Sequence, residues 1–208
     1  DVVEEKNLVR QNFAPIDQGK NKARVLAERY ASVFGMETEY VPSFVEDLDT
    51  LMELITPKNW ELEPNSFKKT PEMVILLGAV DNNKSRQLCH KAFCQSKDLI
   101  YIDSGNGEFS GQVVCGVRKN GRTVFKPVGG VMPEMLRDTD KFPTELSCAE
   151  AAQSDPQSMA ANITAAIAVV DMVYNILTHG EGIVRQMDFS TKTVRMQTIL
   201  EKQRRKAA

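Results

Sequence analysis

The chain has 208 residues, of which 42% are hydrophobic, and this is enough apolar material for one sizeable core. Its formal net charge of -2, with acidic and basic residues mixed along the sequence, excludes a protein that holds nucleic acid through an overall basic field. Four cysteines without a CxxC pair exclude a disulfide-dense scaffold, and they indicate a reducing compartment, for which the cytoplasm is the default.

The first half of the chain carries the elements of an α/β protein. Residues 19–34 place apolar side chains at steps of three and four and end before Gly35, which predicts an amphipathic helix. Residues 36–45 alternate like a short strand, and residues 47–55 have the spacing of a second helix. Three further elements follow, namely a strand at 71–81, a helix at 84–96 and a strand at 99–105. This succession predicts an α/β architecture with a largely parallel sheet.

The second half carries two predicted hairpins and a loop. Residues 111–128 hold two strand-like runs joined at Asn120-Gly121, which is the strongest short hairpin signal. Residues 183–200 again indicate two strands around a polar turn. Residues 129–144 are rich in Gly, Pro and charge, and they indicate a long loop.

A strongly apolar stretch, residues 158–177, lies between the two hairpins. Its composition suits a membrane span, but it holds polar side chains that are costly in lipid, namely Asn162, Thr164, Asp171 and Asn175. We therefore expect a buried helix or a helix at a subunit interface, and no membrane insertion.

Several polar residues have no obvious place in a hydrophobic core. They are Asn7, Arg10 and Gln11 in the run NLVRQ, Lys20 and Lys22 at a helix start, and Asp81 with Asn82 after the aliphatic strand. Ligands bind at the carboxyl ends of strands in open parallel sheets, and a carboxylate there can hold Mg²⁺. Two cations near a helix N-terminus are unfavourable unless a phosphate binds there. For each residue taken alone, a surface charge or a structural salt bridge is the alternative.

The glycine-rich segment at 105–111, GNGEFSG, does not match a dinucleotide-binding loop. Its spacing is G-x-G-x-x-x-G rather than G-x-G-x-x-G, and a predicted strand follows it where the motif needs a helix. We interpret its glycines as turn residues. This argues against an oxidoreductase that binds NAD, which stays an alternative.

Five sequence blocks, taken in order, identify a family resemblance. They are DVVEEKNLVRQNF, DQGKNKA, VDNNKSR, SGNGEFSGQV and SCAEA. Together they resemble the ThiF/MoeB adenylyltransferases and the related ubiquitin-activating enzymes, from residue 1 to about residue 199. The resemblance implies a Rossmann-like three-layer fold with a mixed, largely parallel sheet. It implies one adenylation domain over 1–208, with a nucleotide-binding part at 1–110, a part for carrier binding and dimerisation at 111–199, and a basic tail at 200–208.

The resemblance also implies a binding site for the triphosphate of ATP. Asn7 and Arg10 match the family's asparagine and arginine at this site, and Gln11 lies beside them. Lys22 matches the family's lysine after a one-residue gap, and Lys20 is a second candidate for that position.

Asp81 matches the magnesium-binding aspartate of the family's DN motif, and Asn82 follows it. In family members these groups help the C-terminal carboxylate of a carrier protein to attack the α-phosphorus of ATP, which gives an acyl-adenylate and pyrophosphate. Such a transfer needs charge neutralisation and an in-line approach, so its first step requires no protein nucleophile.

Cys148 lies where many relatives carry a cysteine that takes the acyl group as a thioester or a persulfide link. A cysteine at a helix start can have a lowered pKa, which suits this role, but simple packing at the helix entry is the alternative. We interpret Cys89 and Cys94 as core residues of a helix and Cys115 as a strand residue. The paired CxxC motifs that hold zinc in many relatives are absent from the sequence, so we expect no zinc.

Relatives begin with a strand and a glycine-rich turn that cradles the nucleotide, whereas this sequence starts at the second acid of their D-x-D ending. We therefore expect the first βα unit to lie outside the given residues, together with an arginine that relatives contribute to a partner subunit. We do not expect Asp1 to bind ribose.

These observations lead us to predict an ATP- and Mg²⁺-dependent adenylyltransferase. We expect it to be a cytoplasmic homodimer that activates the C-terminus of a small ubiquitin-like or sulfur-carrier protein. From a different class of function, the alternative is a noncatalytic scaffold that keeps the carrier-binding surface and has lost the chemistry.

Overall fold

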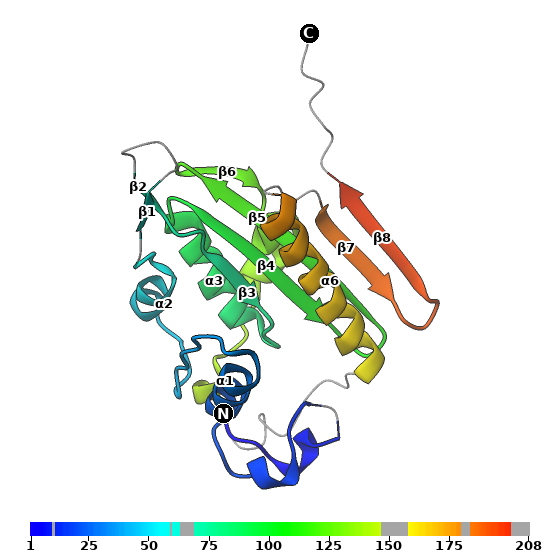
Figure 1. Cartoon of the computed structure of the whole chain (residues 1–208). Coiled ribbons are helices and arrows are strands. Elements are labelled where there is room, and N and C mark those ends of the chain that lie inside the picture. Colours follow the sequence, from blue (N-terminus) through cyan, green and yellow to red (C-terminus); the bar gives the residue numbers. More distant parts are fainter. Residues whose placement is uncertain (10, 59, 63–68, 147–157, 180–183, 201–208) are drawn as a thin grey trace. The chain divides into compact units, whose positions relative to one another are not determined.

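The computed structural model describes residues 1–9, 11–58, 60–62, 69–146, 158–179 and 184–200. The chain divides into two compact units, Asp1–Val45 and Glu46–Ala208. The second unit is an α/β structure around a six-stranded sheet (Figure 1). The predicted division of a single domain into a nucleotide-binding part, a carrier-binding part and a tail stays a prediction.

The first unit is built around one helix and two short 3-10 turns. These elements are η1 (Glu5–Asn7), η2 (Pro15–Asp17) and α1 (Lys22–Phe34). α1 confirms the helix predicted at 19–34. It begins at Lys22 because the side chain of Asn21 caps it, accepting a hydrogen bond from the Arg24 amide at 3.0 Å. It ends at Gly35, whose φ of 63° lies in the left-handed region that favours glycine.

The strand predicted at 36–45 is wrong, because this fully described segment forms neither helix nor strand. Alternation of polar and apolar residues supplies the two faces of a strand, but the backbone also needs a neighbouring strand as a hydrogen-bonding partner. Pro42 removes one backbone donor, and its carbonyl accepts a hydrogen bond from the Asn21 side chain at 2.9 Å.

The second unit contains the six-stranded sheet. Its strands are β3 (Ile75–Gly78), β4 (Leu99–Asn106), β5 (Ser110–Lys119), β6 (Arg122–Phe125), β7 (Val184–Ser190) and β8 (Arg195–Leu200). They lie in the order β3-β4-β5-β7-β8, and β6 pairs with β5 beside that path. A separate two-stranded sheet joins β1 (Trp60–Leu62) to β2 (Lys69–Pro71), neither of which the sequence pattern predicted.

The mixed α/β fold is confirmed, but the proportion of parallel pairing in the sheet needs a correction. β3 and β4 run parallel, whereas the other pairings among the described strands of this sheet are antiparallel. Short turns join β4 to β5, β5 to β6 and β7 to β8, and strands joined in this way must run antiparallel. In the β5–β6 turn, Asn120 and Gly121 have φ angles of 52° and 72°, which confirms the predicted tight hairpin.

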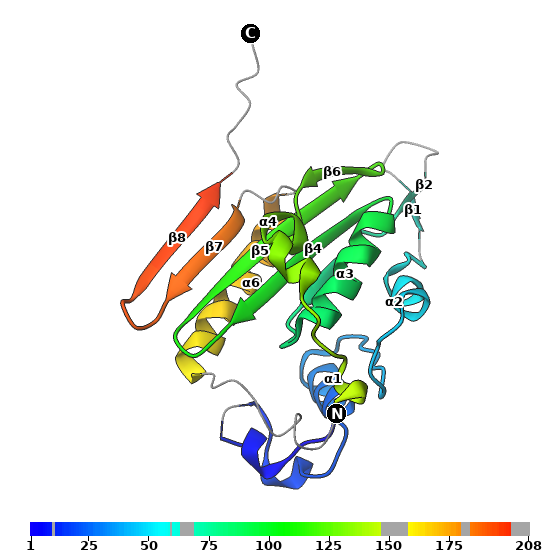
Figure 2. The same cartoon turned by 180° about the vertical axis from the view of Figure 1, so that it is seen from behind.

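Helices cover both faces of the sheet and produce the predicted three layers. α3 (Asn83–Gln95) and α4 (Val128–Val131) lie on one face, and α6 (Met159–His179) lies on the other (Figures 1 and 2). α2 (Leu48–Ile55) packs against α3. These elements confirm the predicted helices at 47–55, 84–96 and 158–177. The predicted loop at 129–144 instead contains part of α4 and the 3-10 turns η3 (Pro133–Arg137) and η4 (Pro143–Glu145).

Alternate side chains of β4 face different layers. Tyr101 contacts Phe93 of α3, with ring centroids 6.5 Å apart, while Ile102 packs in the same hydrophobic cluster as the inner face of α6. Tyr101, Phe93 and Ile102 are all fully buried. β4 thus separates an α3 side of the sheet from an α6 side.

α6 buries one face and exposes the other. The buried residues recur at steps of three and four and pack against the sheet; they are Ala161, Ala165, Ala168, Met172 and Ile176. The exposed apolar row, called the α6 apolar face below, consists of Ile163, Ile167, Val170, Tyr174 and Leu177. Among the described helices, α6 is the one long and apolar enough to cross a membrane by length and composition. Only the inner face of α6 is buried, against the sheet, and the predicted position at a subunit interface stays a prediction.

Candidate functional site

The turn after β3 presents Asp81 where the parallel pair β3–β4 ends. β3 ends at Gly78 and α3 begins at Asn83, so one short turn joins them. Asp81 is exposed, as a ligand at this edge must be. The Asn82 side chain, a predicted nucleotide contact, caps α3 by accepting a hydrogen bond from the Ser85 amide at 2.8 Å.

Arg86, which the sequence analysis did not single out, reaches from the first turns of α3 back to this turn. Its guanidinium donates from Nη2 to the Val80 carbonyl and from Nη1 to Asn83 Oδ1, the latter at 3.1 Å. Its Nε donates to Asp103 Oδ1 on β4 at 3.3 Å. The side chains of Arg86 and Asp103 are 12% and 1% exposed, so this is a buried ion pair.

The surroundings of Asp103 are polar on the α3 side of the sheet. The Tyr101 hydroxyl donates to Asp103 Oδ2 at 2.7 Å. Burial raises the pKa of Asp103, and the charge of Arg86 and the hydrogen bonds from Tyr101 and Arg86 oppose that rise. Burial also raises the pKa of Tyr101. A Cβ atom on Gly78 would lie 2.8 Å from Asp103 Oδ2, so a glycine at the end of β3 leaves room for the carboxylate.

The start of α3 is also bound by the segment that follows β6. Asn83 donates from its amide to Asp140 Oδ2 at 2.8 Å and from Nδ2 to Asp138 Oδ2 at 2.6 Å. Gln87 Nε2 donates to the carbonyls of Met135 and Asp138 at 3.0 and 2.9 Å. Residues 135–140 of the predicted loop are therefore held against the start of α3 by hydrogen bonds, next to the Asp81 turn.

The predicted nucleotide residues of the opening run have structural contacts within the first unit. Asn7 is 2% exposed, and its Oδ1 accepts a hydrogen bond from the Glu4 amide at 2.8 Å. The Gln11 amide donates to the Asn7 carbonyl at 2.8 Å. Lys22 forms an ion pair with Asp1 at 2.5 Å. Asn7 therefore has a structural role in this loop, and the residue pattern did not predict that role. Its predicted contact with a nucleotide stays a prediction.

Arg10 and Lys20 are the other two predicted cations of this region. Arg10 lies outside the described residues. Lys20 is exposed, and its carbonyl accepts a hydrogen bond from the Val3 amide at 2.8 Å. That the predicted residues of the first unit converge with Asp81 around one ligand stays a prediction.

Asp81 fits a magnesium ion that takes most of its ligands from phosphate and water. Within the described parts of the chain, no group of three or more His, Cys, Asp or Glu side chains could hold a metal ion. Magnesium in nucleotide sites is commonly bound through one or two carboxylates together with substrate phosphates. The Asp81 turn therefore suits a metal that arrives with a nucleotide.

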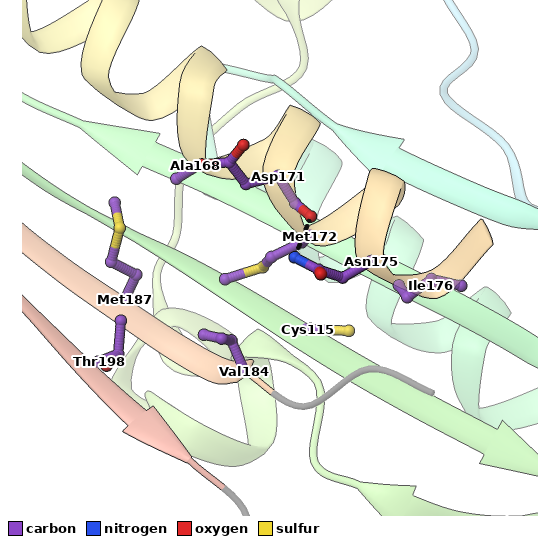
Figure 3. Close-up of a pocket in the computed structure, with 9 residues that line it drawn as sticks. All are labelled: Cys115, Ala168, Asp171, Met172, Asn175, Ile176, Val184, Met187 and Thr198. Carbon is purple, nitrogen blue, oxygen red and sulfur yellow. Dashed lines mark hydrogen bonds between the residues drawn. The ribbon is translucent and has the colours of Figure 1, made fainter. Parts of the chain in front are cut away.

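A cavity of about 340 Å³ lies on the α6 side of the sheet, between α6 and strands β5, β7 and β8 (Figure 3). Its lining is mostly apolar and consists of Cys115, Ala168, Asp171, Met172, Asn175, Ile176, Val184, Met187 and Thr198. The Asn175 side chain donates to the Asp171 carbonyl at 2.8 Å. No basic side chain occurs among these lining residues, so the cavity lacks the charge that a triphosphate requires.

The cysteines divide into buried and exposed thiols. Cys89 on α3 and Cys115 on β5 are buried, and burial raises the pKa of each to about 11. The interpretation of Cys94 as a core residue is wrong, because it is exposed, with Sγ 3.6 Å from His90 Nε2. Five residues along a helix correspond to a rotation of about 140° from the starting face, so Cys89 and Cys94 point differently. Cys148 lies outside the described residues, and its role stays a prediction.

We expect an alkylating reagent at about pH 8 to modify Cys94 at least about tenfold faster than Cys89 and Cys115 in the folded protein. The buried thiols stay protonated at this pH because their pKa values are about 11. Mass spectrometry of peptides taken at successive times measures the three rates. The protein unfolded in guanidinium is the control, in which the rates should become similar. Equally fast modification of Cys115 and Cys94 in the folded protein contradicts the prediction.

Solved structures share the fold of this chain. Escherichia coli MccB with ATP is 14% identical, with a TM-score of 0.61, over 96% of this chain and 54% of that chain. MccB with MccA is 13% identical, with a TM-score of 0.59, over 100% of this chain and 56% of that chain. PaaA is 19% identical, with a TM-score of 0.59, over 96% of this chain and 62% of that chain.

Family membership rests on a separate comparison. The chain spans little more than half the length of the MccB chains, and no curated protein matches it. The model of the ThiF family, however, matches residues 1–207. This match covers nearly every residue, including the Asp81 turn and both predicted groups of nucleotide contacts. The chain therefore belongs to the ThiF family.

Proposed function

We propose that the protein carrying this chain is an ATP- and Mg²⁺-dependent adenylyltransferase, which activates the C-terminal carboxylate of a small ubiquitin-like or sulfur-carrier protein. One observation carries the proposal: a ThiF-family chain places an exposed aspartate, Asp81, at the carboxyl ends of its parallel strands β3 and β4. MccB, which shares the fold, has been solved with ATP and with MccA, and this supports an enzyme that takes a nucleotide and a second partner.

In the proposed reaction, an oxygen of the carrier's carboxylate forms a bond to the α-phosphorus of ATP. The bond from that phosphorus to the bridging oxygen breaks, and pyrophosphate leaves. Both reactants are negatively charged, so positive charge near the phosphates lowers the barrier more than a protein nucleophile would. Arg10 and Lys22 supply this charge, and Asp81 would hold Mg²⁺, which neutralises phosphate charge when bound.

We assign Cys148 to a second step, in which its thiolate attacks the acyl-adenylate. A thioester bond then forms between the carrier and Cys148, and AMP leaves. Cys148 stands in the block SCAEA, at a position where many members of the family it resembles carry such a cysteine, and this supports the assignment. The first step does not depend on the thiol, so the two steps are separable by substitution.

We also infer that the protein is a homodimer whose interface includes the α6 apolar face. The five side chains of this face are between 51% and 66% exposed and follow one another along the helix. A continuous apolar row of this kind usually marks an interaction surface in a soluble protein. A second copy can cover it with the same row, because a two-fold axis brings identical surfaces together.

Exchange of pyrophosphate into ATP, measured with the full-length protein and a candidate carrier, tests the proposed function. Asp81→Asn keeps the size of the side chain but removes its charge, and Arg10→Ala removes a cation. We expect each to lower exchange about 100- to 1000-fold, the usual effect of losing one charge-stabilising group. Asp49→Asn, on the exposed surface of α2, is the control and should retain exchange. Equal rates in Asp81→Asn and Asp49→Asn contradict the proposal, and carrier binding without wild-type exchange identifies a noncatalytic scaffold.

We expect Cys148→Ala to leave pyrophosphate exchange unchanged and to abolish a covalent adduct with the carrier. The substitution removes the proposed acceptor of the second step without touching the charges used in the first. Intact-mass measurement under non-reducing conditions detects the adduct. Cys94→Ala, which removes an exposed thiol on α3, is the control and should keep it. An adduct that persists in Cys148→Ala overturns the role of this residue.

We expect Val170→Asp to convert the dimer into monomers, because it places a charge within the α6 apolar face, where Val170 is 64% exposed. Sedimentation velocity across a concentration series measures the mass. Val124→Asp is the matched control, since Val124 is 51% exposed on β6 and lies outside that face. The interface is disproved if Val170→Asp and Val124→Asp sediment alike, and a wild-type monomer at every concentration disproves the dimer.

A further inference from the structure

The backbone on both sides of Asp81 is held by side chains of α3 and its cap. On one side, the Val80 carbonyl accepts a hydrogen bond from Arg86 Nη2. On the other side, Asn82 Oδ1 accepts a hydrogen bond from the Ser85 amide at 2.8 Å. The same guanidinium reaches Asn83 Oδ1 at 3.1 Å, so one planar group contacts residues before and after the carboxylate.

Asp103 keeps this guanidinium in place. Its Oδ1 accepts from Arg86 Nε at 3.3 Å, and its Oδ2 accepts from the Tyr101 hydroxyl at 2.7 Å. Because the Asp103 side chain is 1% exposed, withdrawal of Arg86 would leave a buried carboxylate without its cation, which is strongly unfavourable. Arg86 therefore cannot turn toward solvent as a surface arginine does.

Two glycines provide the space that this pair occupies. A Cβ atom on Gly78 would lie 2.8 Å from Asp103 Oδ2, and one on Gly105 would lie 2.7 Å from Gln112 Nε2 and 3.2 Å from Arg86 Nη2. These glycines belong to the ends of β3 and β4, next to the Asp81 turn. The backbone at this edge is thus shaped to admit the ion pair.

We propose that Arg86, anchored by Asp103, is a positioning residue for the magnesium-binding carboxylate of Asp81. This inference rests on the proposed function, since it names how the chain prepares that site for a metal–nucleotide complex. Arg86 acts through its hydrogen bonds to the Val80 carbonyl and to Asn83, so it sets the direction in which the Asp81 side chain points from the turn. Partners of this kind, which orient a metal ligand without touching the metal, commonly change metal affinity or activity by about 10- to 100-fold.

Arg86→Lys separates this role from simple charge pairing. Lysine keeps a positive charge for Asp103, but its single ammonium group cannot contact Val80, Asn83 and Asp103 in the geometry of a fork. Arg118→Lys is the matched control. Arg118 donates from Nε to the Ser96 carbonyl at 2.6 Å, so it holds the backbone at the opposite end of α3.

Two measurements on the full-length protein test the inference. Hydrogen exchange should become at least about tenfold faster in Arg86→Lys at the amides of Asn83 and Ser85, which are hydrogen-bonded at the α3 start, and should be unchanged there in Arg118→Lys. The magnesium concentration that half-saturates pyrophosphate exchange should rise about 10- to 100-fold in Arg86→Lys alone, and high magnesium should restore the rate.

The outcomes distinguish this inference from the function on which it rests. Magnesium curves that coincide for Arg86→Lys and Arg118→Lys overturn the positioning role while the function stands. A wild-type protein that shows no exchange overturns the function, and the amide data alone then decide whether Arg86 orders the turn. If Arg86→Lys does not fold, the double variant Arg86→Gln with Asp103→Asn, which leaves no unpaired charge, takes its place in both measurements.

Discussion

A buried ion pair between a helix and a strand organises the part of the second unit that matters for chemistry. Arg86 and Asp103 are both shielded from water, so neither can lose the other without a large energetic cost. The pair fixes α3 against β4 and holds the turn that joins β3 to α3. The hydroxyl of Tyr101 and the glycines at the strand ends complete this arrangement. The proposed metal ligand, Asp81, is thus exposed to solvent, while the largely buried side chain of Arg86 fixes the backbone of its turn by a hydrogen bond.

The two sides of the sheet serve different purposes in the proposed enzyme. Polar groups collect on the α3 side, where a carboxylate, a guanidinium and a phenol share hydrogen bonds. The α6 side holds the hydrophobic cluster, an apolar cavity and a helix whose outer face is exposed. The proposed activation of a carboxylate needs the polar groups of the α3 side, because low-dielectric surroundings strengthen preorganised charges. The proposed association of two copies needs the apolar surface of the α6 side, because burial of apolar area drives association.

Local signals in the sequence predicted the elements that depend on local chemistry. Asn120-Gly121 predicted the hairpin turn, and Gly35 predicted the end of α1. The aliphatic run before Asp81 predicted that this residue follows a strand, which is β3. Features that depend on distant partners were not predictable in this way. Residues 36–45 alternate between polar and apolar side chains as a strand does, but they lack a pairing strand. Arg86 looks like any surface arginine of a helix in the sequence, because its partner Asp103 lies 17 residues later on another element. An aspartate inside the apolar run LIYIDSG was the signal available for that pair.

Alternation along β4 also bears on how proteins of this kind diversify. Neighbouring residues of one strand, such as Ile102 and Asp103, belong to separate layers, so inherited changes in one layer leave the other in place. A substitution on the outer surface of α6 can therefore alter the proposed dimer interface without touching the Asp81 turn. A fold divided in this manner allows the proposed assembly surface and the proposed nucleotide site to change separately in evolution.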